Sequence, residues 1–126
     1  MTKTCISTTS APAAIGPYSQ GISTGSLVFC SGQIALDPSS GELLSSSIAE
    51  ETSLCINNLK AILEEAGSGL DRILKTTIYV TDMNDFAEVN EAYGSFFPSE
   101  PPARATVGVA ALPKGARVEV ECVAAV

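Results

Sequence analysis

The chain has 126 residues, which is enough for one domain with a hydrophobic core and too few for two. Only 17% of the residues are charged, whereas a typical domain has about a quarter. Because a small domain has a large surface for its volume, this shortage of charge predicts that part of the surface is buried in a homo-oligomer. The net charge of −7, with no basic run, argues against a nucleic-acid partner and against a polybasic membrane contact.

Residue types that are missing exclude several kinds of site. The chain contains no histidine, which removes His-based zinc sites, Ser-His-Asp and Cys-His nucleophilic pairs, and histidine acid–base catalysis. The sequence also has no Gly-rich phosphate loop and no dinucleotide fingerprint. Any chemistry must therefore use carboxylates, arginine, tyrosine, backbone groups and water.

The cysteines and the N-terminus bear on the compartment. The four cysteines include no Cys-x-x-Cys pair, which favours reduced apolar side chains over a redox or disulfide role. The first ten residues, MTKTCISTTS, have the features of neither a secretory signal nor a good transit peptide. No apolar run nears the ~20 residues that a membrane span needs. We therefore expect a cytoplasmic protein, with an organelle as the remaining alternative.

The first half of the chain predicts a hairpin followed by a helix. Residues 11–17 are irregular because of two prolines and a glycine. Residues 18–24 and 26–32 have strand patterns with a turn between them, and residues 35–47 form a loop. A helix is expected from Ser47, since Ser47 and Glu50 fit a capping box, and glycines at 67 and 69 end it. Its apolar face consists of Ile48, Cys55, Leu59, Ile62 and Leu63.

The second half predicts strand, helix, strand and strand. Residues 72–80 alternate with period two, which puts Leu74, Thr76, Ile78 and Val80 on one face and Ile73, Lys75, Thr77 and Tyr79 on the other. Asp82 fits the cap of a helix that ends at Pro98 and carries Phe86, Val89, Tyr93 and Phe96. Strands follow at 103–111 and 117–125. The order ββ–α–β–α–ββ predicts a single α+β domain over 1–126, with both helices on one face and neighbouring subunits on the other.

Arg104 lies near the start of the apolar C-terminal segment PPARATVGVAALPKGARVEVECVAAV (101–126), and Glu119 lies near its end. Strand alternation puts Arg104 on one face with Thr106 and Gly108, whose small side chains leave room beside it. A desolvated guanidinium needs a partner, and its planar fork fits a carboxylate. That partner is an internal acid, an acid of another subunit or a ligand anion. Glu119 is equally open, because a strand acid can simply face solvent.

Geometry restricts how Arg104 and Glu119 meet. If LPKG (112–115) made a tight hairpin, Arg104 would lie far beyond the strand partner of Glu119, and the two side chains could not touch. Either these two strands are not simple neighbours, or two subunits complete the site.

Four segments together resemble the RidA family, also called YjgF/YER057c/UK114, at consistent order and spacing over essentially the whole chain. They are APAAIGPYSQ (11–20), SGQIALDPSSGEL (31–43), VNEAY (89–93) and PPARATVGVAALPKGARVEVE (101–121). The most specific part is Pro-Ala-Arg followed by Leu-Pro-Lys-Gly and then Val-Glu-Val-Glu. The resemblance implies a chorismate-mutase-like (YjgF-like) α+β fold with a mixed sheet, assembled as a homotrimer with clefts between subunits.

The resemblance also implies an activity. It is the hydrolysis of reactive 2-imino acids, 2-iminobutanoate and 2-iminopropanoate, to 2-keto acids and ammonia, with no cofactor and no metal. Such imines are released by pyridoxal-phosphate dehydratases acting on serine and threonine. A protonated imine is already electrophilic, so the enzyme needs to hold a carboxylate and a water rather than supply a strong nucleophile. The missing histidine is then no obstacle.

Roles are implied residue by residue. Arg104 matches the carboxylate-binding arginine, and Glu119 matches the acid that places the attacking water. The binding positions matched in the pocket are Tyr18, Ser31, Gly32, Asn90 and Thr106. Many bacterial members have cysteine where this chain has Thr106; in them the backbone carbonyl holds the water, so threonine is expected to serve, and a thiol role is excluded here.

Other readings remain open at this point. Taken singly, Tyr18, Ser31, Gly32 and Asn90 also fit purely structural roles. The trimer could be a non-catalytic binding module or chaperone-like protein in which Arg104 captures a carboxylate. An endoribonuclease or translation inhibitor is the weaker alternative, because the chain is acidic and has no histidine.

Overall fold

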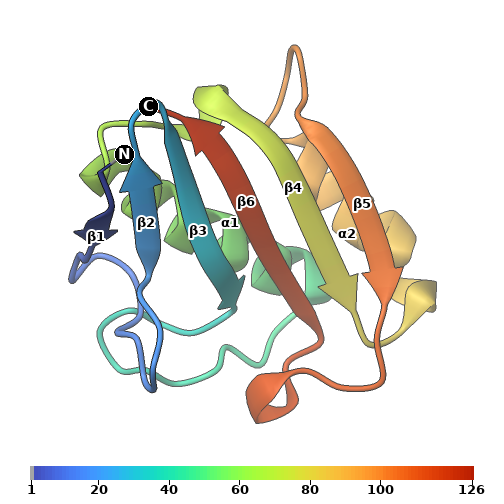
Figure 1. Cartoon of the computed structure of the whole chain (residues 1–126). Coiled ribbons are helices and arrows are strands. Elements are labelled where there is room, and N and C mark those ends of the chain that lie inside the picture. The colour runs from blue at the N-terminus through green and yellow to red at the C-terminus, as the bar shows by residue number, and fades with distance from the viewer. Residues whose placement is uncertain (1) are drawn as a thin grey trace.

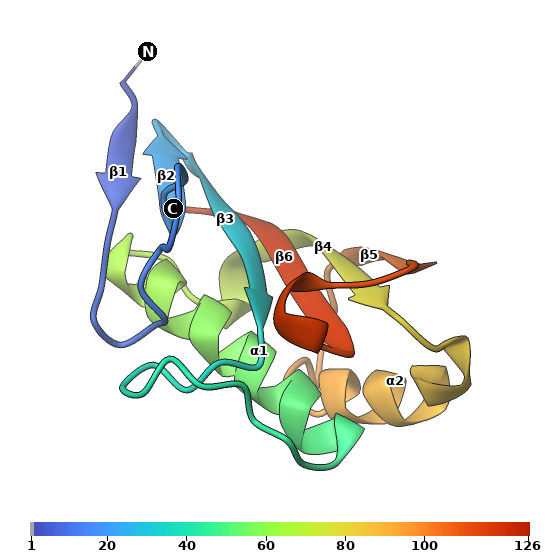
Figure 2. The ribbon, with the colours of Figure 1, turned by 90° about the horizontal axis from the view of Figure 1, so that it is seen from below.

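The computed structural model describes residues 2–126 and shows six strands in one mixed sheet, with both helices on the same face (Figures 1 and 2). The predicted class and element order are confirmed, with one short strand added at the N-terminus. In chain order the elements are β1 (Thr4–Ile6), β2 (Gly21–Thr24), β3 (Leu27–Ile34), α1 (Ile48–Glu65), β4 (Ile73–Val80), α2 (Phe86–Gly94), β5 (Ala103–Gly108) and β6 (Val118–Ala125). Three 3₁₀ turns lie at η1 (Leu70–Arg72), η2 (Met83–Asp85) and η3 (Pro113–Gly115).

The strand order shows that β5 and β6 do not form a tight hairpin through LPKG (112–115). The sheet runs β1-β2-β3-β6-β4-β5, and every neighbouring pair is antiparallel except β4 and β5, which are parallel. β4 therefore separates β5 from β6, and the chain crosses it through η3 instead of making a tight hairpin (Figure 1). Of the two alternatives, the strands are indeed not simple neighbours.

Helix α1 begins where its cap predicts. The Ser47 hydroxyl accepts a hydrogen bond from the Glu50 N–H at 3.1 Å. The Glu50 carboxylate accepts from the Ser46 hydroxyl at 2.6 Å, so the carboxylate half of the predicted capping box is wrong. Gly67, with φ at 82°, lets the chain leave the helix in the left-handed region. The buried face packs on the sheet through Cys55, Ile56, Leu59, Ile62 and Leu63.

Helix α2 begins later than predicted. Asp82 accepts a hydrogen bond from the Asn84 N–H at 2.9 Å and so caps the turn η2. The α-helix starts only at Phe86, after that turn. Asp82 is a cap, as predicted, but it caps the 3₁₀ turn that precedes the α-helix.

The predicted faces of β4 are confirmed except at its first two residues. Thr76, Ile78 and Val80 are buried against the helices, as the period-two pattern predicts. At the first two positions the assignment is wrong, because Ile73 is buried and Leu74 is 50% exposed. The register of β4 against β6 is irregular between residues 73 and 75, and a one-residue irregularity moves side chains to the other face.

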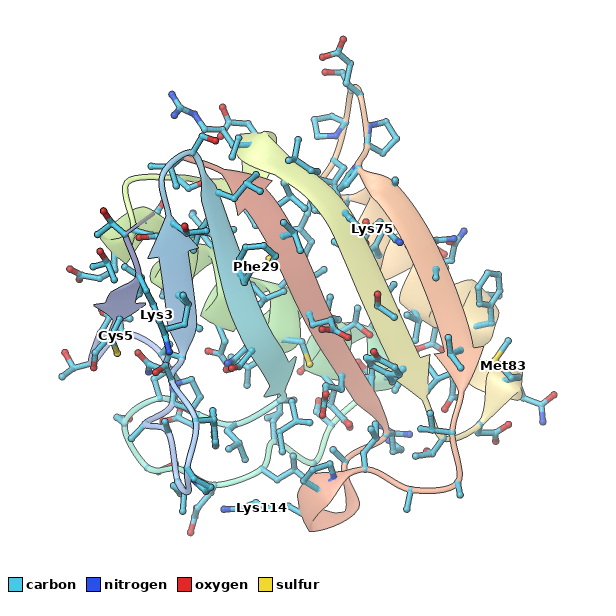
Figure 3. The ribbon with its side chains drawn as sticks, viewed as in Figure 1. Lys3, Cys5, Phe29, Lys75, Met83 and Lys114 are labelled. Atoms are coloured by element: carbon cyan, nitrogen blue, oxygen red, sulfur yellow. The ribbon has the colours of Figure 1, made fainter. Side chains whose placement is uncertain are left out.

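The sheet face away from the helices is open in the single chain. Phe29 and Val107 are 45% and 42% exposed on it, and Figure 3 shows Phe29 and Lys75 on this side. Tyr79 and Glu121 lie on the same face.

Within residues 2–126, no helix is long and apolar enough to cross a membrane.

Candidate active site

One cavity gathers three of the predicted site residues. It has a volume of about 320 Å³ and lies where the N-terminal loop meets the end of β3 and the start of β6. Tyr18, Gly32 and Glu119 line it together with Ile15 and Lys114. Lys114, which the sequence places between the last two strands, has a left-handed φ of 59° and extends from η3 toward the N-terminal loop (Figure 3). The Leu-Pro-Lys-Gly segment itself was the signal that could have pointed to this residue.

A buried glutamine holds the loop that carries Tyr18. The Gln20 side-chain amide donates hydrogen bonds to the carbonyls of Thr8, Ala11 and Pro12 at 3.1, 3.3 and 2.7 Å. Its oxygen accepts from the Thr8 N–H at 2.7 Å. Buried polar groups are stable only when paired in this way, so Gln20 fixes the shape of residues 8–20.

Ser31 ties the same loop to the sheet. Its hydroxyl donates to the Ser19 carbonyl at 2.6 Å, and its N–H donates to the Gln20 carbonyl at 2.9 Å. The residue was predicted to line the pocket, and the structure gives its hydroxyl a partner in the loop beside the cavity. Its contribution is to fix the segment that carries Tyr18.

Gly32 and Glu119 are packed closely together. The register of β3 and β6 is irregular between Cys30 and Gln33, and this irregularity brings Gly32 under the Glu119 side chain. A methyl group at Gly32 would lie 2.8 Å from the Glu119 Cδ and closer still to its Oε2. Glycine is therefore needed here to leave room for the carboxylate.

The environment of Glu119 disfavours its charged form. Burial raises the pKa of this half-buried carboxyl above its usual 4.5, and the negative charge of Glu121 raises it further. Glu121 in turn accepts a hydrogen bond from the Tyr79 hydroxyl. A carboxyl whose pKa moves toward neutrality is better suited to exchange protons with a reacting water.

Arg104 lies on the other side of the sheet. Its Nη1 donates to the Asn90 Oδ1 at 2.7 Å, and its Cζ is 5.1 Å from the centre of the Tyr93 ring. Asn90, Tyr93 and Arg104 line a second cavity, of about 440 Å³, between α2 and the start of β5. Thr106 follows on the same strand face, and its hydroxyl is buried without a hydrogen-bond partner among residues 2–126.

The two halves do not meet within one chain. Arg104 lies beside Thr76 of β4, which lies beside Cys122 of β6. Two strand spacings of about 4.8 Å and three residues of about 3.3 Å put the Cα atoms of Arg104 and Glu119 about 14 Å apart. Their side chains also point to opposite faces, because Arg104 contacts α2 whereas Glu119 sits on the open face between buried Val118 and Val120.

Among residues 2–126, no group of three or more Cys, Asp or Glu is arranged to hold a metal ion.

Comparison with known proteins decides the family. The family model described as endoribonuclease L-PSP, which represents the RidA/YjgF proteins, matches residues 8–126. The chain belongs to the RidA family. The predicted resemblance is thereby confirmed over nearly the whole sequence.

Individual relatives of this RidA-family chain carry different names. It is 50% identical to the mouse 2-iminobutanoate/2-iminopropanoate deaminase over 119 residues, which cover 94% of this chain and 88% of the mouse protein. Its fold matches that of a putative endoribonuclease from Thermotoga maritima with a TM-score of 0.95 at 44% identity, covering 98% of this chain and 97% of the other. It also matches Escherichia coli TdcF with bound serine, with a TM-score of 0.93, 43% identity and 98% coverage of both chains. The family thus includes imine deaminases, and its YjgF-like fold is that of this chain.

Proposed function

We propose that the chain is a 2-imino acid deaminase, which hydrolyses 2-iminobutanoate and 2-iminopropanoate at sites shared between copies of a homotrimer. The observation that carries the proposal is the separation of the two half-sites. A carboxylate-binding group and a water-placing group each line a cavity, but they lie about 14 Å apart and on opposite sides of one sheet. A second copy that brings its Arg104 to the Glu119 cavity makes one complete site.

The open sheet face supports this assembly. It exposes Phe29, Leu74 and Val107, which are large apolar side chains that a monomer rarely leaves uncovered together. A cyclic arrangement in which one cavity of each copy meets the other cavity of the next produces as many equal sites as there are copies. The low share of charged residues points the same way.

The proposed reaction needs only binding and proton transfer. The Arg104 guanidinium holds the substrate carboxylate through charge-assisted hydrogen bonds. Glu119 accepts a proton from a water that attacks the imine carbon, which gives a carbinolamine. Glu119 returns that proton to nitrogen; the C–N bond then breaks as the C=O bond forms, and the hydroxyl proton passes to the departing ammonia. Protonated imine and water thus become keto acid and ammonium. Positioning two reactants in this way supplies several kcal/mol of the barrier reduction.

The imine hydrolyses quickly in water, so the assay must generate it in the reaction mixture. A threonine or serine dehydratase is coupled to the purified protein, and keto acid release is followed while semicarbazide competes for the imine. Faster release that is lost in a folded Arg104→Ala variant supports the deaminase. No acceleration by a folded wild-type assembly would reject it.

A non-catalytic carboxylate-binding protein is the second candidate. It is favoured by the structure of Escherichia coli TdcF with bound serine, a ligand that carries a carboxylate and is not an imine. The Glu119→Ala variant separates the two functions. In the deaminase it lowers kcat more than it weakens keto acid binding, because the partner of Glu119 is water; equal losses in both would contradict that role.

A further inference from the structure

The guanidinium of Arg104 is held by neutral groups. Its Nη1 bonds the Asn90 amide oxygen at 2.7 Å, and its Cζ lies 5.1 Å from the Tyr93 ring centre and 5.8 Å from that of Phe86. Residues 86, 90 and 93 are four and then three apart on α2, so they share one face of the helix. Among residues 2–126, the ion pair between Arg117 and Glu51 is the one the structure contains, and Arg104 takes no part in it.

This arrangement leaves Arg104 charged and partly free to bind. A guanidinium has five N–H donors, and Asn90 uses one of them. A carboxylate neighbour would neutralise the arginine and compete with a ligand, whereas an amide oxygen and aromatic faces do neither. Aromatic rings attract a cation through their faces and so hold it without occupying its hydrogen-bond donors.

Tyr93 is itself fixed by the core. It is 4% exposed, its hydroxyl shares a hydrogen bond of 2.7 Å with the Thr76 hydroxyl, and its ring centre is 4.8 Å from that of Phe97. Thr76 lies directly beside Arg104 in the register of β4 and β5. Burial raises the pKa of Tyr93, so the phenol is neutral and offers Arg104 its ring and no negative charge. The plane on which the guanidinium rests is therefore set by buried contacts.

We propose that Tyr93 is a positioning residue that, together with Phe86, seats the Arg104 guanidinium so that its free N–H groups face a monocarboxylate ligand. The inference rests on the proposed function for the identity of the ligand, and its geometry is independent of turnover. Tyr93 lines the same cavity as Arg104, and both rings act through the guanidinium that they hold.

The test compares Tyr93→Leu and Phe86→Leu, which remove a ring, with Tyr93→Phe, which keeps it. Affinity for 2-oxobutanoate is measured by calorimetry, and KM and kcat are measured in the dehydratase-coupled assay. We expect each leucine variant to weaken 2-oxobutanoate binding and raise KM about two- to fivefold with kcat changed less than twofold, and Tyr93→Phe to stay close to wild type. Adding Tyr93→Leu to Arg104→Ala should weaken binding no further, since the ring acts through the arginine.

A second readout needs no ligand. Ring currents should displace the Arg104 Nε–H resonance in wild type, and Tyr93→Leu should return it toward the position of a free arginine. Tyr93→Leu opens the core, so Phe86→Leu, at a half-buried position, supplies the same comparison if the first variant melts at a much lower temperature.

Different results would contradict the positioning of Arg104 and the deaminase activity. Wild-type affinity in folded leucine variants, an unmoved Arg104 resonance, or no 2-oxobutanoate binding by wild type would each reject the positioning role of Tyr93 and Phe86. Binding that depends on Arg104 and on the rings, without imine hydrolysis, would reject the deaminase and leave the positioning role intact.

Discussion

Substitution of Gly32 by alanine should reduce turnover without disturbing the fold. The φ of Gly32 lies outside the left-handed region, so alanine can adopt its backbone conformation. The new methyl group would stand 2.8 Å from the Glu119 Cδ. Carbon atoms prefer separations of about 3.5–4.0 Å, so the carboxylate must retreat by about 1 Å. It can do so cheaply, because it is the end of a flexible side chain.

The expected loss follows from that displacement. Misplacing a catalytic group by about 1 Å costs up to about a hundredfold in rate, so kcat in the dehydratase-coupled assay should fall about ten- to a hundredfold. The melting temperature should change little, since Gly32 is exposed. The 2-oxobutanoate affinity should also be largely kept, because the carboxylate is bound by Arg104.

A double-mutant cycle tests whether the clash with Glu119 is the cause. In the Glu119→Ala background no carboxylate is left to displace, so adding Gly32→Ala should change nothing further. Losses that multiply in the double variant would refute the reasoning, as would a Gly32→Ala enzyme with wild-type kcat.

Two further perturbations probe the charge and the framework of the same cavity. Glu121→Gln removes a negative charge that raises the Glu119 pKa, so the acid limb of kcat, where Glu119 becomes protonated, should move to lower pH. Gln20→Met leaves the carbonyls of Thr8, Ala11 and Pro12, the last two of them buried, without their donor, so urea denaturation should show a loss of about 2 kcal/mol in the free energy of unfolding.

Each of these has a matched control. The acid limb should be missing from the residual activity of Glu119→Gln, and a limb that stays in place in Glu121→Gln would remove Glu119 from the proton transfer. Because Gln20 holds the Tyr18 loop, Gln20→Met should also raise KM. Unchanged stability would mean that water replaces the lost hydrogen bonds at no cost.

Local signals in the sequence predicted most of the elements. The Ser47 hydroxyl and the glycine at 67 mark the ends of α1 because both act through hydrogen bonds and dihedral angles within a few residues. Period-two alternation correctly predicted the buried face of β4 at Thr76, Ile78 and Val80. It failed at Ile73 and Leu74 because the irregularity arises from pairing with β6, a strand far away in the chain.

The candidate site was harder to predict than the fold. Alternation correctly put Arg104 and Thr106 on one face of a strand, but no local pattern states that β4 lies between β5 and β6. The closeness of Gly32 to Glu119 and the seating of Arg104 on Tyr93 likewise depend on pairing between distant segments. The family motifs supplied the residue types, and the structure supplied their separation into two cavities.

Complementation between two inactive variants tests the shared site most directly. Arg104→Ala and Glu119→Ala chains are co-expressed in equal amounts and purified together as mixed oligomers. If each site takes Arg104 from one copy and Glu119 from the next, random mixing restores about a quarter of the sites, and activity should return to about a quarter of wild type. If the mixed oligomers stay as inactive as each variant alone, the two residues do not combine across copies, and the account of a shared site is wrong.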